Sequence, residues 1–241
     1  MTFSHSYQQL DPTQYVEAFK DPLWYLKLEQ PLLEYFWGYT GEDHARRSPE
    51  WHATRREWVV MVSEFLDQGL IILGSFGENW DRDRKPIDTI VIHHSSTEPN
   101  TSVSYLDAIS LLRLHSFYCL KVGEPEYHRP VWSNHFYQGR QTFIPYHYLV
   151  RRDGSVEQLL EDGHVGWHAG KSVNGRSVAI CFVDDLENAR PSEQALSAAK
   201  QIIAQYQPER LVGHGEVHAG RTCPGGLFFG EGGWKQQLLA Q

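Results

Sequence analysis

The stretch Ile87-Asp-Thr-Ile-Val-Ile-His93 is rich in β-branched residues and predicts a short buried strand. Further along the chain, Asp153-Gly154 is a strong turn signal and predicts a hairpin. Strand patterns and helical patterns alternate on both sides of this turn, which is typical of an α/β domain. The other predicted elements are strands at residues 146–150, 155–160, 176–183 and 211–213 and helices at residues 103–117 and 192–206.

Residues 11–73 have a different character, with few glycines and with apolar residues at helical spacing. The charged run Asp81-Arg-Asp-Arg-Lys-Pro86 is typical of a linker, and residues 118–145 fit no period and predict a long loop. We therefore predict a helical N-terminal region over residues 1–85, of unknown function, and a second domain over residues 86–241. The N-terminal region also carries five tryptophans, which are Trp24, Trp37, Trp51, Trp58 and Trp80. They either pack against the second domain or bind a partner, and we favour packing.

The chain of 241 residues carries a formal net charge of −8, and its Lys and Arg are scattered. This balance argues against nucleic acid as a partner and against an anionic membrane surface. The apolar run at residues 70–73 is far too short to span a bilayer, so we expect no membrane insertion. Met1-Thr-Phe-Ser-His-Ser6 lacks the basic and apolar regions of a secretory signal, which favours a cytoplasmic protein. Release by a separate export or lysis system is the alternative, and no pattern predicts an oligomeric state.

Residues that commonly bind metals follow two of the predicted strands. His93 and His94 close the first strand, His214 follows the last strand, and Cys223 comes nine residues later. Two imidazoles and a thiolate suit Zn²⁺, and three protein ligands leave the open position of a catalytic zinc site. A histidine at a strand end is also a common hydrogen-bonded polar residue, and spacing alone gives the two interpretations equal weight.

Five ordered segments add a second argument. They are Ile90-Val-Ile-His93-His94-Ser95, Pro145-Tyr146 to Asp153-Gly154, Val165-Gly-Trp-His168-Ala-Gly170, Asn174-Gly-Arg-Ser177-Val-Ala-Ile180 and His214 to Gly226. Together these segments resemble the zinc-dependent N-acetylmuramoyl-L-alanine amidases, a family that includes phage lysozyme-type amidases, cytoplasmic anhydro-muropeptide amidases and animal peptidoglycan recognition proteins. The resemblance covers about residues 86–230 and implies a mixed central β-sheet flanked by helices.

The resemblance implies roles for single positions. His93, His214 and Cys223 match the three zinc ligands of the phage and animal branches. Tyr146 matches a tyrosine beside the metal, and Arg221 stands where phage enzymes carry a lysine. Such residues suit amide hydrolysis, because a Tyr hydroxyl or an Arg guanidinium can stabilise a developing oxyanion. We therefore expect Tyr146 and Arg221 to be catalytic.

The same resemblance bears on the proton acceptor and on the substrate contacts. One branch of the family uses a glutamate as base where this chain has Cys181, which leaves His147, His168 and the attacking hydroxide itself as alternatives. His168, Asn174 and Arg176 match a part of the family that faces the substrate, so we expect them to bind it. Turn formation is the alternative for Asn174 and Arg176.

These assignments predict a zinc-dependent N-acetylmuramoyl-L-alanine amidase that cuts the amide between the muramyl lactyl group and L-alanine. The expected partner is peptidoglycan or a muropeptide, and a recycling role and a lytic role both fit; Tyr146 and Cys223 favour the lytic branch. The alternative is a non-catalytic peptidoglycan-binding module of the same fold. We disfavour it because relatives of that kind lack a zinc ligand, whereas His93, His214 and Cys223 are all present.

Overall fold

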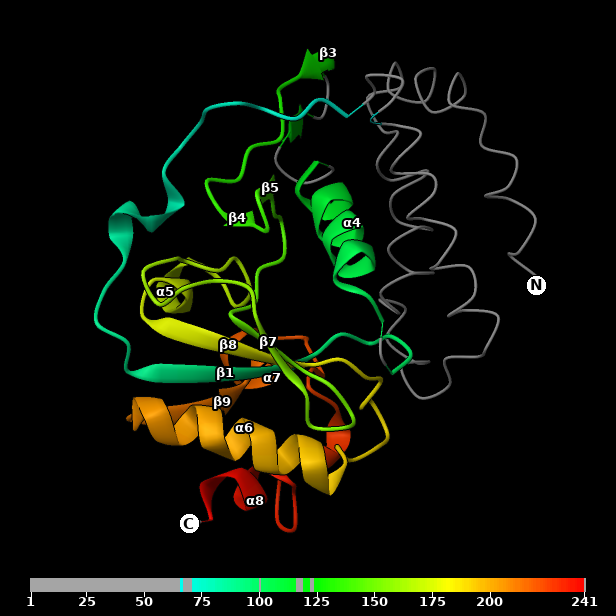
Figure 1. Cartoon of the computed structure of the whole chain (residues 1–241), viewed down its shortest axis with the longest axis vertical. Coiled ribbons are helices and arrows are strands. Elements are labelled where there is room, and N and C mark those ends of the chain that lie inside the picture. Colours follow the sequence, from blue (N-terminus) through cyan, green and yellow to red (C-terminus); the bar gives the residue numbers. More distant parts are fainter. Residues whose placement is uncertain (1–65, 67–70, 100, 116–118, 122–123, 241) are drawn as a thin grey trace, which may run out of the picture. The chain divides into compact units, whose positions relative to one another are not determined.

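The computed structural model describes residues 66, 71–99, 101–115, 119–121 and 124–240 (Figure 1). The predicted N-terminal helices fall almost entirely outside these residues, so that part of the prediction stays a prediction. The chain divides into two compact units. The first comprises Met1–Glu78 and Val103–Ser133, and the second comprises Asn79–Ser102 and Asn134–Gln241.

A five-stranded sheet forms the centre of the second unit. Its strands are β1 (Thr89–His94), β6 (Tyr148–Val150), β7 (Val156–Gln158), β8 (Ser177–Phe182) and β9 (Arg210–Gly213). The order is β7-β6-β8-β1-β9, and all neighbours run parallel except the β6–β7 hairpin. Gly154 takes φ +85° in the hairpin turn, a conformation that glycine adopts without strain. The mixed central sheet confirms the predicted fold class.

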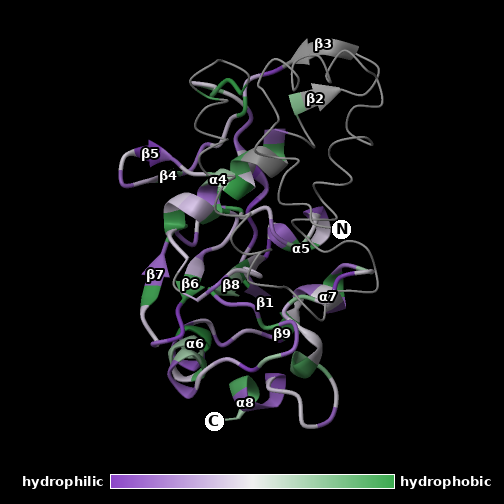
Figure 2. Ribbon diagram, turned by 90° about the vertical axis from the view of Figure 1, so that its right-hand side faces the viewer, coloured by the Kyte–Doolittle hydropathy of each residue, from purple (hydrophilic) through white to green (hydrophobic). Residues whose placement is uncertain are grey.

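Helices cover both faces of this sheet. The long helix α6 and the C-terminal helix α8 pack on one face, and the short helices α5 and α7 pack on the other (Figure 1). Hydrophobic and hydrophilic residues share α6 and α8, as expected of helices with one buried side (Figure 2). The helices are α5 (Lys171–Asn174), α6 (Glu193–Tyr206), α7 (His214–Val217) and α8 (Lys235–Leu239).

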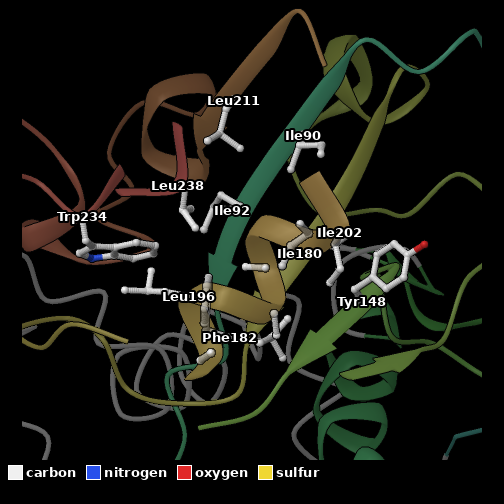
Figure 3. Close-up of a cluster of buried hydrophobic side chains, with 14 of the residues drawn as sticks. Ile90, Ile92, Tyr148, Ile180, Phe182, Leu196, Ile202, Leu211, Trp234 and Leu238 are labelled. Atoms are coloured by element: carbon white, nitrogen blue, oxygen red, sulfur yellow. The ribbon is translucent and has the colours of Figure 1, made fainter. Parts of the chain in front are cut away.

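The apolar core lies between the sheet and α6. Ile90 and Ile92 of β1 point into it with Leu196 of α6, and Trp234 closes one end (Figure 3). Side chains alternate between the two faces of a strand. The odd-numbered residues of β1 therefore point to the opposite face, and His93 is one of them. The alternation that builds the core also directs a candidate metal ligand away from it.

Short elements complete the described residues. The first unit contains α4 (Val103–Leu114) and a hairpin of β2 (Leu120–Lys121) and β3 (Glu124–His128). The second unit contains another hairpin, formed by β4 (Phe136–Tyr137) and β5 (Arg140–Gln141). The prediction of one long loop over residues 118–145 is therefore wrong, because strands this short show no period. Among the described residues, no helix has the length and apolar character needed to span a membrane.

Candidate active site

The parallel strands β1, β8 and β9 end at one edge of the sheet, and this edge carries two of the predicted metal ligands. His93 is the fifth of the six residues of β1, and His214 follows β9 directly. Because β1 and β9 are paired neighbours, the two imidazole rings meet with their centroids 4.7 Å apart. The carboxyl edge of a parallel sheet is the usual place for a ligand site in an α/β domain.

Cys223 joins these two histidines. Its Sγ lies 3.7 Å from His93 Nδ1 and accepts a hydrogen bond from the backbone N–H of His94 at 3.4 Å. One ligand atom from each of His93, His214 and Cys223 lies within 4.8 Å of the others. Two imidazole nitrogens and a thiol sulfur gathered in this way fit Zn²⁺, and a set of three leaves the fourth position of a tetrahedron open.

The loop that carries Cys223 is held against the segment that follows β8. Thr222 Oγ1 donates a hydrogen bond to Glu187 Oε2 at 3.0 Å. Gly225 has φ +113°, and a Cβ at this position would overlap the carbonyl oxygen of Leu186. Only glycine fits both the backbone conformation and the close approach. These contacts set the position of the Cys223 sulfur relative to β1.

Tyr146 lies two residues before β6 and packs its ring against His93, with the ring centroids 5.1 Å apart. Its hydroxyl hydrogen-bonds the thiol of Cys181, the residue of β8 that pairs with His93 in the sheet. Burial raises the pKa of the Cys181 thiol well above its usual value, and the neighbouring Cys223 raises it further. Cys181 is therefore a protonated thiol, which cannot serve as a base.

Arg221 lies two residues before Cys223 and is half-buried. Burial lowers the pKa of its guanidinium, while the charge of Cys223 raises it. Because the ordinary pKa of a guanidinium exceeds 12, Arg221 stays positively charged at neutral pH. The structure therefore places a permanent cation close enough to Cys223 to interact with its thiolate.

His168 lies behind His93. Its Nδ1 is 3.0 Å from His93 Nε2, and its Nε2 is 3.1 Å from Ser177 Oγ. The residue is only 6% exposed, and this burial, followed by the charges of His147 and His214, lowers its pKa well below the usual value. The expected substrate contact does not fit this position, because both ring nitrogens already have partners within the protein.

Asn174 and Arg176, the other two expected substrate contacts, are also held by partners within the protein. Asn174 is 5% exposed, and its Oδ1 accepts a hydrogen bond from Ala169 N at 2.8 Å, which closes the loop before α5. Arg176 forms an ion pair with Asp88 through two nitrogen–oxygen contacts at the amino ends of β8 and β1. His93 lies at the opposite, carboxyl end of the same strands. The geometry fits the turn interpretation for Asn174 and a surface ion pair for Arg176.

His147 is fully buried and is bound by the backbone on both sides of its ring. Its Nδ1 accepts a hydrogen bond from Ala179 N at 3.2 Å, and its Nε2 donates to the carbonyl oxygen of His164 at 3.1 Å. Burial, followed by the charge of Arg84, lowers the pKa of His147 to about 3. With neither nitrogen open, His147 does not fit the role of proton acceptor, and the same argument applies to His168.

The charged segment before β1 organises the loop that carries His168, and sequence reasoning missed this. Asp81 Oδ1 accepts a hydrogen bond from Val165 N at 2.7 Å. Arg84 Nη1 donates to the carbonyl oxygens of Asn174 at 3.3 Å and Ser177 at 2.8 Å. Residues 79–85 thus belong to the second unit and do not form a linker. A run of charges carries no local signal that distinguishes a solvated segment from one that binds backbone groups elsewhere in the chain.

Comparison with known proteins identifies relatives in sequence and in structure. The endolysin of Escherichia phage T7 is 28% identical over 152 residues, which are 59% of this chain and 83% of that protein. Peptidoglycan-recognition protein SD of Drosophila melanogaster is 32% identical over 103 residues, which are 39% of this chain and about half, 54%, of that protein. A solved structure, the endolysin amidase LysCS from Clostridium intestinale URNW, aligns with a TM-score of 0.44 at 20% identity, over 65% of this chain and 87% of that one.

A family model described as N-acetylmuramoyl-L-alanine amidase matches residues 83–226. This match spans well over half of the chain and contains the whole group formed by His93, His214 and Cys223. The chain therefore belongs to the N-acetylmuramoyl-L-alanine amidase family.

Proposed function

We propose that this chain is a zinc-dependent amidase that hydrolyses the bond between the muramyl lactyl group and L-alanine in peptidoglycan or in soluble muropeptides. The observation that carries the proposal is the convergence of His93, His214 and Cys223, whose ligand atoms lie within 4.8 Å of one another. Three protein ligands with an open fourth position are typical of catalytic zinc, whereas structural zinc has four. The same intact set argues against a module that only binds peptidoglycan.

The chain's own residues support this chemistry. Bound zinc supplies a Lewis acid that polarises the scissile carbonyl and activates water. Tyr146, whose ring lies against His93, is placed to donate its hydroxyl proton in a hydrogen bond to the carbonyl oxygen as negative charge develops. The Arg221 cation stabilises the thiolate form of Cys223, the form that binds a metal.

The structure narrows the alternatives for the proton acceptor. His147 and His168 have hydrogen-bond partners at both ring nitrogens. Cys181 is a buried thiol that stays protonated. These contacts argue against His147 and His168 as the proton acceptor. The attacking hydroxide itself is the alternative from the sequence that is left.

Digestion of purified peptidoglycan, followed by mass spectrometry, tests the proposal. We expect the zinc-loaded protein to release free stem peptides, and we expect a chelator to abolish this release. The variant Cys223→Ala lacks one candidate ligand and should lose zinc and activity together. Release of stem peptides by the metal-free protein would refute the zinc amidase, and binding without cleavage by the zinc-loaded protein would favour the binding module.

The same assay distinguishes two settings for the reaction. Intact sacculi are the substrate of a lytic enzyme, and soluble anhydro-muropeptides are the substrate of a recycling enzyme. We favour the lytic setting, because Tyr146 and Cys223 match the pattern of the phage and animal branches. Faster cleavage of the soluble substrate than of sacculi would reverse this preference. The cytoplasmic location expected from the first residues stays a prediction.

A further inference from the structure

A chain of hydrogen bonds runs from the candidate zinc ligand His93 into the interior of the second unit. His93 Nε2 lies 3.0 Å from His168 Nδ1, and His168 Nε2 lies 3.1 Å from Ser177 Oγ. All three side chains are buried. Because water does not compete for these groups, each bond restricts the ring that it joins.

The geometry determines which nitrogens carry protons. His93 Nδ1 faces the Cys223 sulfur at 3.7 Å, so Nδ1 is the nitrogen that binds the metal and must be unprotonated to do so. The proton of a neutral His93 is then on Nε2, which donates to His168 Nδ1. His168 in turn carries its own proton on Nε2, where Ser177 Oγ accepts it.

We propose that His168, held by Ser177, is the positioning residue of the zinc ligand His93. It accepts the proton on the far side of the His93 ring, and so fixes both the metal-binding tautomer and the plane of that ring. A partner of this kind raises the basicity of a ligating histidine and tightens its hold on the metal. The inference rests on the proposed zinc site and gives His168 a role that requires no contact with substrate.

The loop around His168 is itself fixed from several directions. Ala169 N donates to Asn174 Oδ1 at 2.8 Å, and Val165 N donates to Asp81 Oδ1 at 2.7 Å. Arg84 Nη1 binds the backbone oxygen of Ser177 at 2.8 Å, at the far end of the hydrogen-bonded chain. His168 is therefore presented to His93 by a rigid support, as a positioning residue must be.

Zinc affinity, measured by competition with a chromogenic chelator, tests the proposal. His168→Leu removes the acceptor and keeps an apolar side chain in the buried space. We expect it to weaken zinc binding about 10–100-fold, the usual cost of losing such a partner. His168→Asn places an amide oxygen where Nδ1 was and should recover most of the affinity. Ser177→Ala should also weaken zinc binding, but by less than His168→Leu does. Co²⁺ bound to the His168→Leu variant should show an absorption spectrum that differs from that of the wild-type protein.

The matched control is His164→Leu, which makes the same change in the same loop. The His164 ring accepts a hydrogen bond from Glu161 N at 3.2 Å and supplies no atom to the chain that ends at His93. We expect this variant to lower the melting temperature of the metal-free protein and to leave zinc affinity unchanged.

Three results would contradict the reasoning. Wild-type affinity in His168→Leu, with a lowered melting temperature, would make His168 a structural residue only. Equal weakening by His164→Leu would assign the effect to the loop and not to the bond with His93. Either result overturns this inference alone. A wild-type chain that binds no zinc overturns the proposed function and the inference together.

Discussion

Acid should destabilise the metal-free protein through His147. Burial lowers the pKa of this side chain in the folded protein to about 3, whereas an unfolded chain titrates it at 6.5. Between these two values the unfolded chain binds a proton that the folded protein does not bind. The free energy of unfolding therefore falls as the pH falls. The contribution of neutral His147 to the free energy of unfolding is fully present above pH 6.5 and is lost progressively as the pH falls toward 3.

The size of the effect follows from the shift. One pKa unit corresponds to about 1.4 kcal/mol. The free energy of unfolding therefore falls by roughly 5 kcal/mol in total as His147 becomes protonated, and about 2 kcal/mol of this is lost between pH 7 and pH 5. Domains are stable by only about 5–15 kcal/mol in total, so the change is large enough to measure. The physical causes are burial of the ring, which disfavours its charged form, followed by the charge of Arg84, and the Ala179 N–H already occupies Nδ1, the nitrogen that would take up the proton.

Urea unfolding of the chelator-treated protein across this pH range measures the effect, with His147→Gln as the comparison. The glutamine can still donate to the His164 carbonyl, but it does not titrate and leaves Ala179 N–H without its acceptor. The variant should be less stable at pH 7 by about 1–3 kcal/mol, the cost of an unmade buried hydrogen bond. This deficit should shrink by about 2 kcal/mol at pH 5. Two parallel stability curves would refute the reasoning.

Three further substitutions test the site. Tyr146→Phe should keep its ring against His93 and keep zinc bound, but should lower kcat about 10²–10³-fold through loss of the oxyanion donor; an unchanged rate of stem-peptide release would remove Tyr146 from the mechanism. Arg176→Ala should leave KM unchanged, because its ion pair lies at the amino ends of β8 and β1, opposite the end that carries His93. A raised KM would instead support the substrate contact expected from the sequence. Gly225→Ala should lose zinc, since its Cβ would overlap the Leu186 carbonyl and displace the Cys223 loop; full zinc content by elemental analysis would contradict this.

The secondary structure of the second unit was largely predictable because its signals are local. Ser192 caps α6 with its own hydroxyl, and Asp153-Gly154 forms the turn between β6 and β7. The β-branched run around Ile90 forms β1, an interior strand of the sheet between β8 and β9. Each of these depends on residues that are neighbours in sequence. The hairpins within residues 118–145 were not predictable, because their strands are too short to show a pattern.

The grouping of His93, His214 and Cys223 was also predictable, for a topological reason. Residues that follow parallel strands of one sheet meet at the same edge, so the two histidines had to come close once β1 and β9 were paired. The environment of His168 was not predictable in this way. Its two partners, His93 and Ser177, lie in different strands, and the spacing of the motif does not show which way the ring points.

The amino-acid sequence alone determined the long helix α6, the main strands of the central sheet and the set of candidate metal ligands, because these follow from local periodicity and from the chemistry of two imidazoles and a thiol. Only the tertiary structure decided which polar residues lie at the group of candidate metal ligands, which lie behind it and which are remote from it. Arg176 and Ser177 are adjacent in sequence, yet one forms a surface ion pair and the other is buried under His168. Side-chain burial and direction depend on partners tens of residues away, and no local pattern records those partners.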